Sequence, residues 1–140
     1  MLALIRHRFA PFYDNGSSLG RELPEERIEK MLADDSIFER FFSKGNSDVI
    51  VGTEKTTFLE TIDFLLANYP DECTHFISKH LSLYNKEDFF SLINNMDAMF
   101  PSTGFDDYRI SNNRKLFIVK LIDARINYIL MRLNEYGNQV

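Results

Sequence analysis

The sequence has few of the residues that several common kinds of site and scaffold require. Cys73 is the only cysteine among 140 residues, which excludes an internal disulfide and a zinc site built from several cysteines. Long apolar runs are also missing, because Arg6 and Arg8 interrupt the apolar first residues far short of a signal-peptide core or a membrane span. These absences favour a soluble protein in a reducing, cytoplasmic setting.

Positive charge is scarce as well. The chain has 16 Lys and Arg against 21 Asp and Glu, which gives a net charge of −5. This balance argues against direct binding of nucleic acid through broad neutralisation of phosphates, and leaves room only for a local basic patch. Hydrophobic residues make up 44% of the chain, enough for the core of one domain, so we expect a single domain over residues 1–140.

The stretch Phe9–Gly20 is the part of the sequence most typical of a functional site. Apolar residues lead to Asp14, which is followed by Asn15, Gly16 and two serines. This order predicts a short extended element at the N-terminus that brings the Asp14 carboxylate to a turn. A carboxylate before Asn-Gly occurs at divalent-metal and sugar sites. It also occurs in ordinary turns, and the residues alone favour a turn, because one acid does not hold Mg²⁺ without further ligands or phosphates.

The rest of the chain has helical periodicity and predicts a mainly α fold. Apolar residues recur three and four positions apart, with Pro, Asp, Asn or Ser at the expected helix starts. The expected helices cover residues 24–33, 53–69 and 70–84. Three more are expected after caps: one after Asp34–Ser36 that ends at residue 44, one after Asn85 that ends at residue 96, and the longest, 112–136, after Ser111. Residues 49–52 are either a short extended link or a buried connector, and residues 98–110 are expected to form a loop.

The periodicity also predicts which side chains are buried. In the helix after Pro70 we expect Phe76, Ile77, Leu81, Leu83 and Tyr84 to point inward. In the last helix one arc is apolar except for Arg125, and the opposite arc, which is expected to face water, holds Asn113, Lys120, Asp123, Asn127 and Asn134. Arg125 either pairs with a buried acid for structural reasons or contacts a ligand phosphate, and we favour the structural role.

Other reactive side chains give little support for catalysis. His75 and His80 lie about 140° apart around a helix, so they do not converge on one metal ion. His7 is more typical of a solvated strand edge than of a phosphate contact. Cys73 lies in the first turn of a predicted helix, where a thiol either has a lowered pKa or is buried and inert, and the inert thiol is the default interpretation.

The stretch Arg8–Leu23, with the later stretches Ile110–Ile118 and Ala124–Arg125, resembles the C-terminal lobe of HipA-like serine/threonine kinases. In that family a strand of the form Ala-Pro-hydrophobic-Tyr-Asp delivers a metal-binding aspartate. The resemblance implies that Asp14 is a Mg²⁺ ligand and that the fold is a helical bundle like a kinase C-lobe. It further implies that Mg²⁺ and ATP are cofactors of the complete enzyme.

The sequence departs from this family ahead of Asp14. Phosphoryl transfer needs a phosphate-holding loop, a lysine for the phosphates, a catalytic aspartate and an asparagine for metal, and the family carries these before its metal-binding aspartate. The thirteen residues before Asp14 contain no Gly, Lys, Asp or Asn. We therefore expect an incomplete kinase that is inactive alone, with no catalytic residue of its own, and that needs a complementing kinase lobe.

Three further possibilities for partner and function stay open. An antitoxin-like protein is a second candidate partner of such a lobe. The chain is alternatively a non-catalytic helical module for protein interaction, in which Asp14 is only a turn residue. The third possibility is an unrelated helical protein whose likeness to the kinases is accidental. A fold without a strand ending at Asp14 would favour that interpretation.

Overall fold

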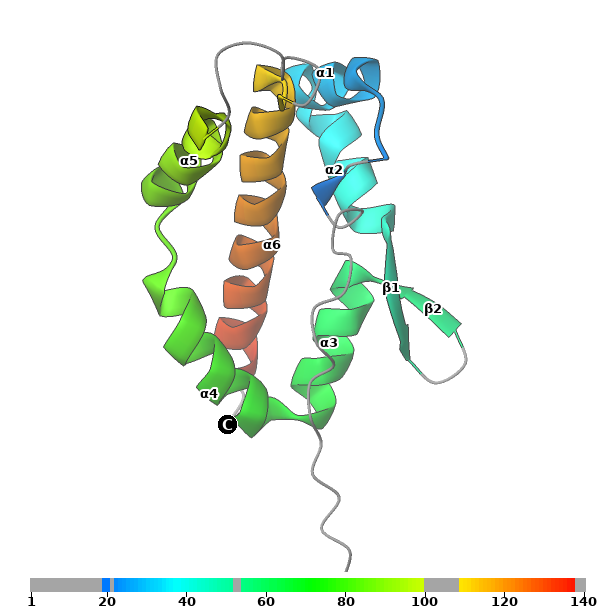
Figure 1. Ribbon diagram of the computed structural model, residues 1–140. Helices are drawn as coiled ribbons and strands as arrows, with labels where there is room; N and C mark the ends of the chain where they lie inside the picture. The colour runs from blue at the N-terminus through cyan, green and yellow to red at the C-terminus, as the bar shows by residue number, and fades with distance from the viewer. Residues whose placement is uncertain (1–18, 21, 52–53, 100–108, 138–140) are drawn as a thin grey trace, which may run out of the picture.

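The structure, a computed structural model, describes residues 19–20, 22–51, 54–99 and 109–137, and these residues are mainly helical (Figure 1). The α-helices are α1 (Glu25–Ala33), α2 (Asp35–Lys44), α3 (Phe58–Asn68), α4 (Pro70–His80), α5 (Lys86–Asn95) and α6 (Asn112–Gly137). Short 3-10 turns follow α4 (Leu81–Leu83) and α5 (Met96–Met99). The mainly α fold class is confirmed, and the predicted N-terminal extended element lies outside the described residues.

Helix α6 lies at the centre of the fold, between the other helices (Figure 1). In Figure 1, α5 lies along one side of α6, while α1, α2 and α3 lie on the other, and α4 links α3 to α5. Helices α1 and α5 pack on α6, and so does α3. In the described part of the chain no helix is both long enough and apolar enough to cross a membrane.

Three of the predicted helix starts are confirmed by side-chain caps. In each, a side-chain oxygen accepts a hydrogen bond from a backbone N–H two or three residues further on, which satisfies a donor that the first turn leaves free. The caps are Asp34 at 2.8 Å, Asn85 at 2.9 Å and Ser111 at 3.1 Å. Pro24 differs from expectation, because it occupies the N-cap of α1 and the helix begins one residue later, at Glu25.

A β-hairpin connects α2 to α3. Strand β1 (Asn46–Val51) pairs antiparallel with strand β2 (Glu54–Thr57), and the two form a two-stranded sheet. Residues 49–51, which the sequence left open between an extended link and a buried connector, therefore belong to a strand.

The prediction that helix α3 starts near Thr53 is wrong, because the helix begins at Phe58. Thr57 forms a capping box with Glu60: Thr57 Oγ1 accepts from the backbone N–H of Glu60 at 3.2 Å, and Glu60 Oε2 accepts from the backbone N–H of Thr57 at 2.8 Å. The β-branched residues just before Phe58 favour extended backbone, so this box sets the boundary between strand and helix.

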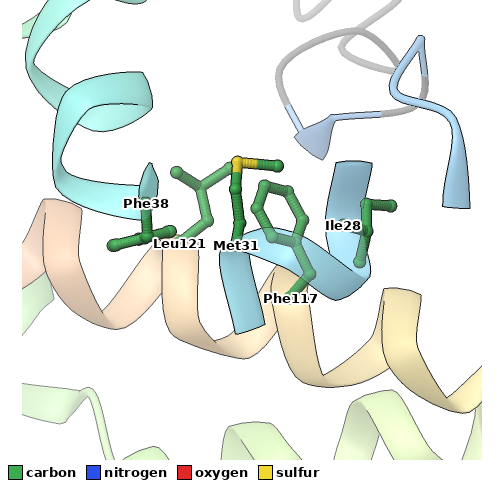
Figure 2. Packing of buried hydrophobic residues seen from close by; sticks show 5 residues of the cluster. All are labelled: Ile28, Met31, Phe38, Phe117 and Leu121. Atoms are coloured by element: carbon green, nitrogen blue, oxygen red, sulfur yellow. The ribbon is translucent and has the colours of Figure 1, made fainter. Parts of the chain in front are cut away.

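The main core joins α1 and α2 to the first half of α6 (Figure 2). Its fully enclosed side chains are Ile28, Met31, Phe38, Phe117 and Leu121. The rings of Phe38 and Phe117 meet edge to face, with centroids 6.3 Å apart and planes at 79°. A smaller cluster of Ile93, Ile118 and Val119 attaches α5 to α6.

Because α6 is packed on several sides, the predicted wet arc is wrong at three of its members, Asn113, Lys120 and Asp123, which are half-buried. Lys120 Nζ donates to the backbone oxygen of Met31 at 3.0 Å and to Asp35 Oδ1 at 2.6 Å. Asp123 accepts from Lys86 Nζ at 2.6 Å. These positions hold neighbouring helices against α6 through their polar ends, a long-range arrangement that the periodicity of one helix does not report.

Two predicted core side chains of the α4 region are exposed. Phe76 is 54% exposed and Leu83 is 81% exposed, whereas Ile77, between them, is buried. The 3-10 turn over Leu81–Leu83 ends the 3.6-residue period, so an extrapolation of the α4 stripe does not hold at Leu83.

Replacement of Phe117 by alanine should lower the free energy of unfolding by about 3–5 kcal/mol, because it leaves a cavity at the centre of the main core. Urea denaturation followed by circular dichroism measures this loss. Leu116, its neighbour on α6, is 45% exposed and provides the matched control. Leu116→Ala should cost less than about 1 kcal/mol, and equal losses for the two variants would contradict the proposed core.

Candidate functional site

Asp14, the predicted Mg²⁺ ligand, lies outside the described residues. The described residues begin with Leu19 and Gly20, the last two residues of the stretch Phe9–Gly20. The structure therefore shows how the end of this stretch, at Leu19 and Gly20, contacts the helical core.

The chain that follows the Asp14 stretch is fastened to α6 by Arg114. Its Nη1 donates to the backbone oxygen of Gly20 at 2.9 Å, and its Nη2 donates to the backbone oxygen of Leu23 at 2.6 Å. Its Nε donates to Glu25 Oε1 at 2.8 Å. All three guanidinium nitrogens thus bind one short segment, which the planar arginine fork does and a lysine ammonium does not. We call Gly20, Leu23, Glu25 and Arg114 the arginine anchor.

Ser111 completes the polar side of the arginine anchor. Its hydroxyl donates to Glu25 Oε2 at 2.7 Å and accepts from the backbone N–H of Arg114 at 3.1 Å. Partial burial acts to raise the pKa of Glu25, but the hydrogen bonds from Ser111 and Arg114 outweigh it and hold that pKa below its usual value. Glu25 is therefore ionised at neutral pH and holds the starts of α1 and α6 together.

Gly20 packs against the core in a conformation that suits only glycine. Its φ of +76° is in the left-handed region. A Cβ at this position would lie 2.7 Å from Phe117 Cε1 and 3.0 Å from Leu23 Cδ1, so any side chain would force these groups to move. The end of the Asp14 stretch is thus held by hydrogen bonds on one side and by an aromatic ring on the other.

The arginine anchor brings together the two longer stretches on which the kinase resemblance depends. Gly20 and Leu23 come from the first of them, and Arg114 and Phe117 from the second, about ninety positions later in the chain. The sequence interpretation did not identify Arg114. One signal was available: Arg114 lies in the first turn of a helix, where the macrodipole disfavours a cation, so a partner acid was to be expected.

Arg125 has a structural environment. Its guanidinium lies 5.2 Å from the centroid of the Phe58 ring, and burial lowers its pKa from the usual value. The contact with Phe58 favours the structural role over a ligand contact.

The described cysteine and histidines do not form a reactive site. Burial, with a smaller effect of the Glu72 charge, raises the pKa of the Cys73 thiol, so the alternative of a lowered pKa is wrong. The His80 ring lies tilted against the ring of Phe76, with centroids 4.5 Å apart, and His75 is exposed. Within the described ranges, no three His, Cys, Asp or Glu side chains are grouped so that they could hold a metal ion. His7 lies outside these ranges.

Two further polar contacts, which the sequence interpretation missed, connect α6 to its neighbours. Lys115 is only 7% exposed, and its Nζ lies 2.5 Å from Asp97 Oδ2. Its Nζ also donates to the backbone oxygen of Asn94 at 3.3 Å. A buried lysine with its acid partner fixes the relative position of α5 and α6, because separating the pair would leave a charge buried.

The second contact joins α3 to the C-terminal half of α6. The hydroxyl of Tyr128 donates to Asp63 Oδ1 at 3.0 Å, and Arg132 Nε donates to the same oxygen at 2.7 Å. Burial, together with the hydrogen bond to Asp63 and its negative charge, raises the pKa of Tyr128 to about 12. The tyrosine is therefore a fixed hydrogen-bond donor and has no role as a base near neutral pH.

Replacement of Arg114 by lysine should lower the free energy of unfolding by about 1–3 kcal/mol, because a point charge leaves some of the three oxygens of the arginine anchor without a donor. Thermal and urea denaturation measure the loss. Arg40→Lys, at an exposed position of α2, is the matched control and should change stability by less than about 0.5 kcal/mol. An Arg114→Lys protein as stable as this control would show that the anchor contributes little.

Tyr128 should titrate near pH 12 in the folded protein, against an ordinary value of 10.0. Since the folded pKa is the higher one, the stability that this group contributes is present below pH 10 and is lost as the pH rises from 10 to about 12. NMR of protein carrying ¹³C-labelled tyrosine follows the titration, and Tyr128→Phe assigns the resonance. In that variant the alkaline loss of stability should be smaller, and a Tyr128 resonance that titrates near 10 would contradict the burial and hydrogen bond described here.

Comparisons with known proteins do not place the chain in a family. No protein-family model matches it, and neither a curated protein nor a solved structure does. The functional interpretation therefore depends on the residues and contacts described above.

Proposed function

We propose that this chain is the helical lobe of an incomplete HipA-like serine/threonine kinase and that it is inactive alone. The observation that carries the proposal is the arginine anchor. Arg114 binds the backbone of Gly20 and Leu23, which follow Asp14 by six and nine residues. A metal-binding carboxylate acts through its position, so a lobe that supplies one must hold the chain beside it.

The arginine anchor also suits a lobe that forms an active site together with a second lobe. Gly20 is fixed by its backbone conformation and by Phe117, and Glu25 is fixed by Ser111 and Arg114. Gly20, Leu23 and Glu25 are thus held by contacts with residues of this same chain. The helical lobe would thus present a prepared surface to the complementing lobe.

Mg²⁺ and ATP fit this chain only in part. Asp14 is one carboxylate, and the described residues hold no cluster of three metal-ligating side chains. Mg²⁺ in kinases takes one or two carboxylates and completes its shell with water and substrate phosphates. When bound, the ion would neutralise charge on the phosphates. The groups that hold ATP would come from the complementing lobe, and we assign no catalytic step to the residues of this chain.

A non-catalytic module for protein interaction is the second candidate, and exposed apolar side chains favour it. Large apolar residues on α4, the turn after it and α5 face solvent, among them Leu83 at 81% and Leu92 at 64% exposed. Such side chains are typical of surfaces that a partner covers, although single ones also occur on ordinary monomers. The candidate partners are an antitoxin-like protein and a complementing kinase lobe.

The decisive experiment is reconstitution. The chain is to be co-expressed with a HipA-like N-terminal lobe encoded ahead of it or beside it, one that carries a glycine-rich loop, a phosphate-binding lysine and a catalytic aspartate. We expect Mg²⁺-dependent transfer of ³²P from ATP to serine or threonine by the pair, and no turnover by the chain alone.

Asp14→Asn should reduce the activity of the pair by about 100-fold or more, as the loss of one charge-stabilising group at a reacting centre does. Asp71→Asn, at an exposed position in the first turn of α4, is the matched control and should leave the activity unchanged. Turnover by the chain alone would refute the proposal of an inactive lobe. A stable but inactive pair in which Asp14→Asn has no effect on binding would favour the interaction module.

A further inference from the structure

A pocket opens where helices α1 and α2 meet. Its volume is about 430 Å³, near the lower end of the range of about 300–1,000 Å³ that is usual for pockets that bind small ligands. It is lined by Arg27, Met31, Ile37, Arg40, Phe41, Lys44 and Gly45. We call it the α1–α2 pocket.

The floor of the α1–α2 pocket is apolar and firmly held. Met31 is fully buried, and the side chains of Ile37 and Phe41 are partly buried and pack against the main core. The Phe41 ring lies 5.9 Å from the ring of Phe117, centroid to centroid. A ligand would therefore meet a surface that is already in place, and burial of an apolar group on it would be favourable without reorganisation of the core.

The rim of the pocket is entirely basic. Arg27 lies on α1, while Arg40 and Lys44 lie one helical turn apart on α2. The pocket has no acidic lining residue, although the whole chain carries a net charge of −5. None of the three cations forms an ion pair within 4.0 Å with a described acid. The Arg27 guanidinium lies 5.9 Å from the centroid of the Phe41 ring, so one cation stands over the apolar floor.

We propose that the α1–α2 pocket binds an acidic peptide segment that inserts one large apolar side chain between flanking carboxylates. The apolar side chain would rest on Ile37 and Phe41, beside the buried Met31. The carboxylates on one side of it would meet Arg27, and those on the other side would meet Arg40 and Lys44.

The distribution of charge selects this occupant over a single-headed anion such as a fatty acid. A fatty acid carries its charge at one end, so it would satisfy the cations of one helix and leave those of the other helix unused. A peptide with acids on both sides of an apolar residue complements both walls at once. The proposal does not depend on the proposed kinase ancestry, because it uses only the residues of α1 and α2 and the glycine that ends α2.

The test is a titration of the ¹⁵N-labelled full chain with the peptide acetyl-Glu-Asp-Phe-Glu-Asp-amide, followed by two-dimensional NMR. We expect saturable shifts that are concentrated in the amides of α1 and α2, and affinity that falls as salt is raised. The same peptide with serine in place of phenylalanine should lose the saturable shifts, since it has no group for the apolar floor. Saturable binding of the serine peptide would overturn the insertion of an apolar side chain.

Charge reversal on the protein provides the matched control. Arg40→Glu with Lys44→Glu should weaken peptide binding about tenfold or more, because like charges then face each other across the rim. Lys55→Glu with Lys79→Glu makes the same change in net charge at exposed positions away from the pocket and should change the affinity less than twofold. Equal weakening by both pairs would show only a general effect of net charge and would overturn the proposal.

Two other outcomes would also overturn it. One is the absence of shifts up to about 1 mM peptide, which corresponds to a binding free energy weaker than about −4 kcal/mol. The other is binding of sodium laurate to the same amides without binding of the peptide, which would assign the pocket to single-headed amphiphiles. Both variants can be checked for folding by circular dichroism, and their changes are at exposed positions, so a loss of binding is separable from a loss of fold.

Discussion

The ring of Phe117 is the constraint on which most of the described structure depends. It is fully buried, meets the ring of Phe38 edge to face, and lies against Phe41, so it closes the core between α1, α2 and α6. The same ring lies so close to Gly20 that a Cβ there would overlap it. One side chain thus packs the helical body and also decides the residue type at the end of the Asp14 stretch.

Local signals in the sequence predicted local structure well. The caps at Asp34, Asn85 and Ser111 and the mainly helical fold are confirmed, because a cap depends only on residues two or three positions away. The errors arise where a boundary or a partner is set elsewhere. The start of α3 depends on a strand that pairs with another strand, and the exposure of Leu83 depends on a 3-10 turn that shifts the helical period. Periodicity in one segment carries no information on either.

The candidate site shows the same contrast between local signals, which the sequence reveals, and long-range contacts, which it does not. The motif around Asp14 could be proposed from neighbouring residues. The role of Asp14 in Mg²⁺ binding stays a prediction, and so does the cytoplasmic setting. The contacts of Arg114 with Gly20 and Leu23 could not be found in this way, because Arg114 lies about ninety residues from them. Arg114 in the first turn of α6 is unfavourable when that helix is considered alone. It becomes favourable only when Glu25 is brought beside it, at 2.8 Å, by the packing of α1 on α6.

Helix α1 belongs to both the arginine anchor and the α1–α2 pocket, which raises the question of whether the pocket controls the Asp14 stretch. Control would require α1 to have two arrangements of similar energy that a ligand distinguishes. Met31, which forms part of the pocket floor, is fully enclosed, and its backbone oxygen accepts from Lys120 on α6. A shift of α1 would open the core at Met31 and break this contact, and close-packed cores resist such a change. The pocket is therefore best understood as a docking site on a rigid body, whose occupant would locate a partner beside the anchor without moving it.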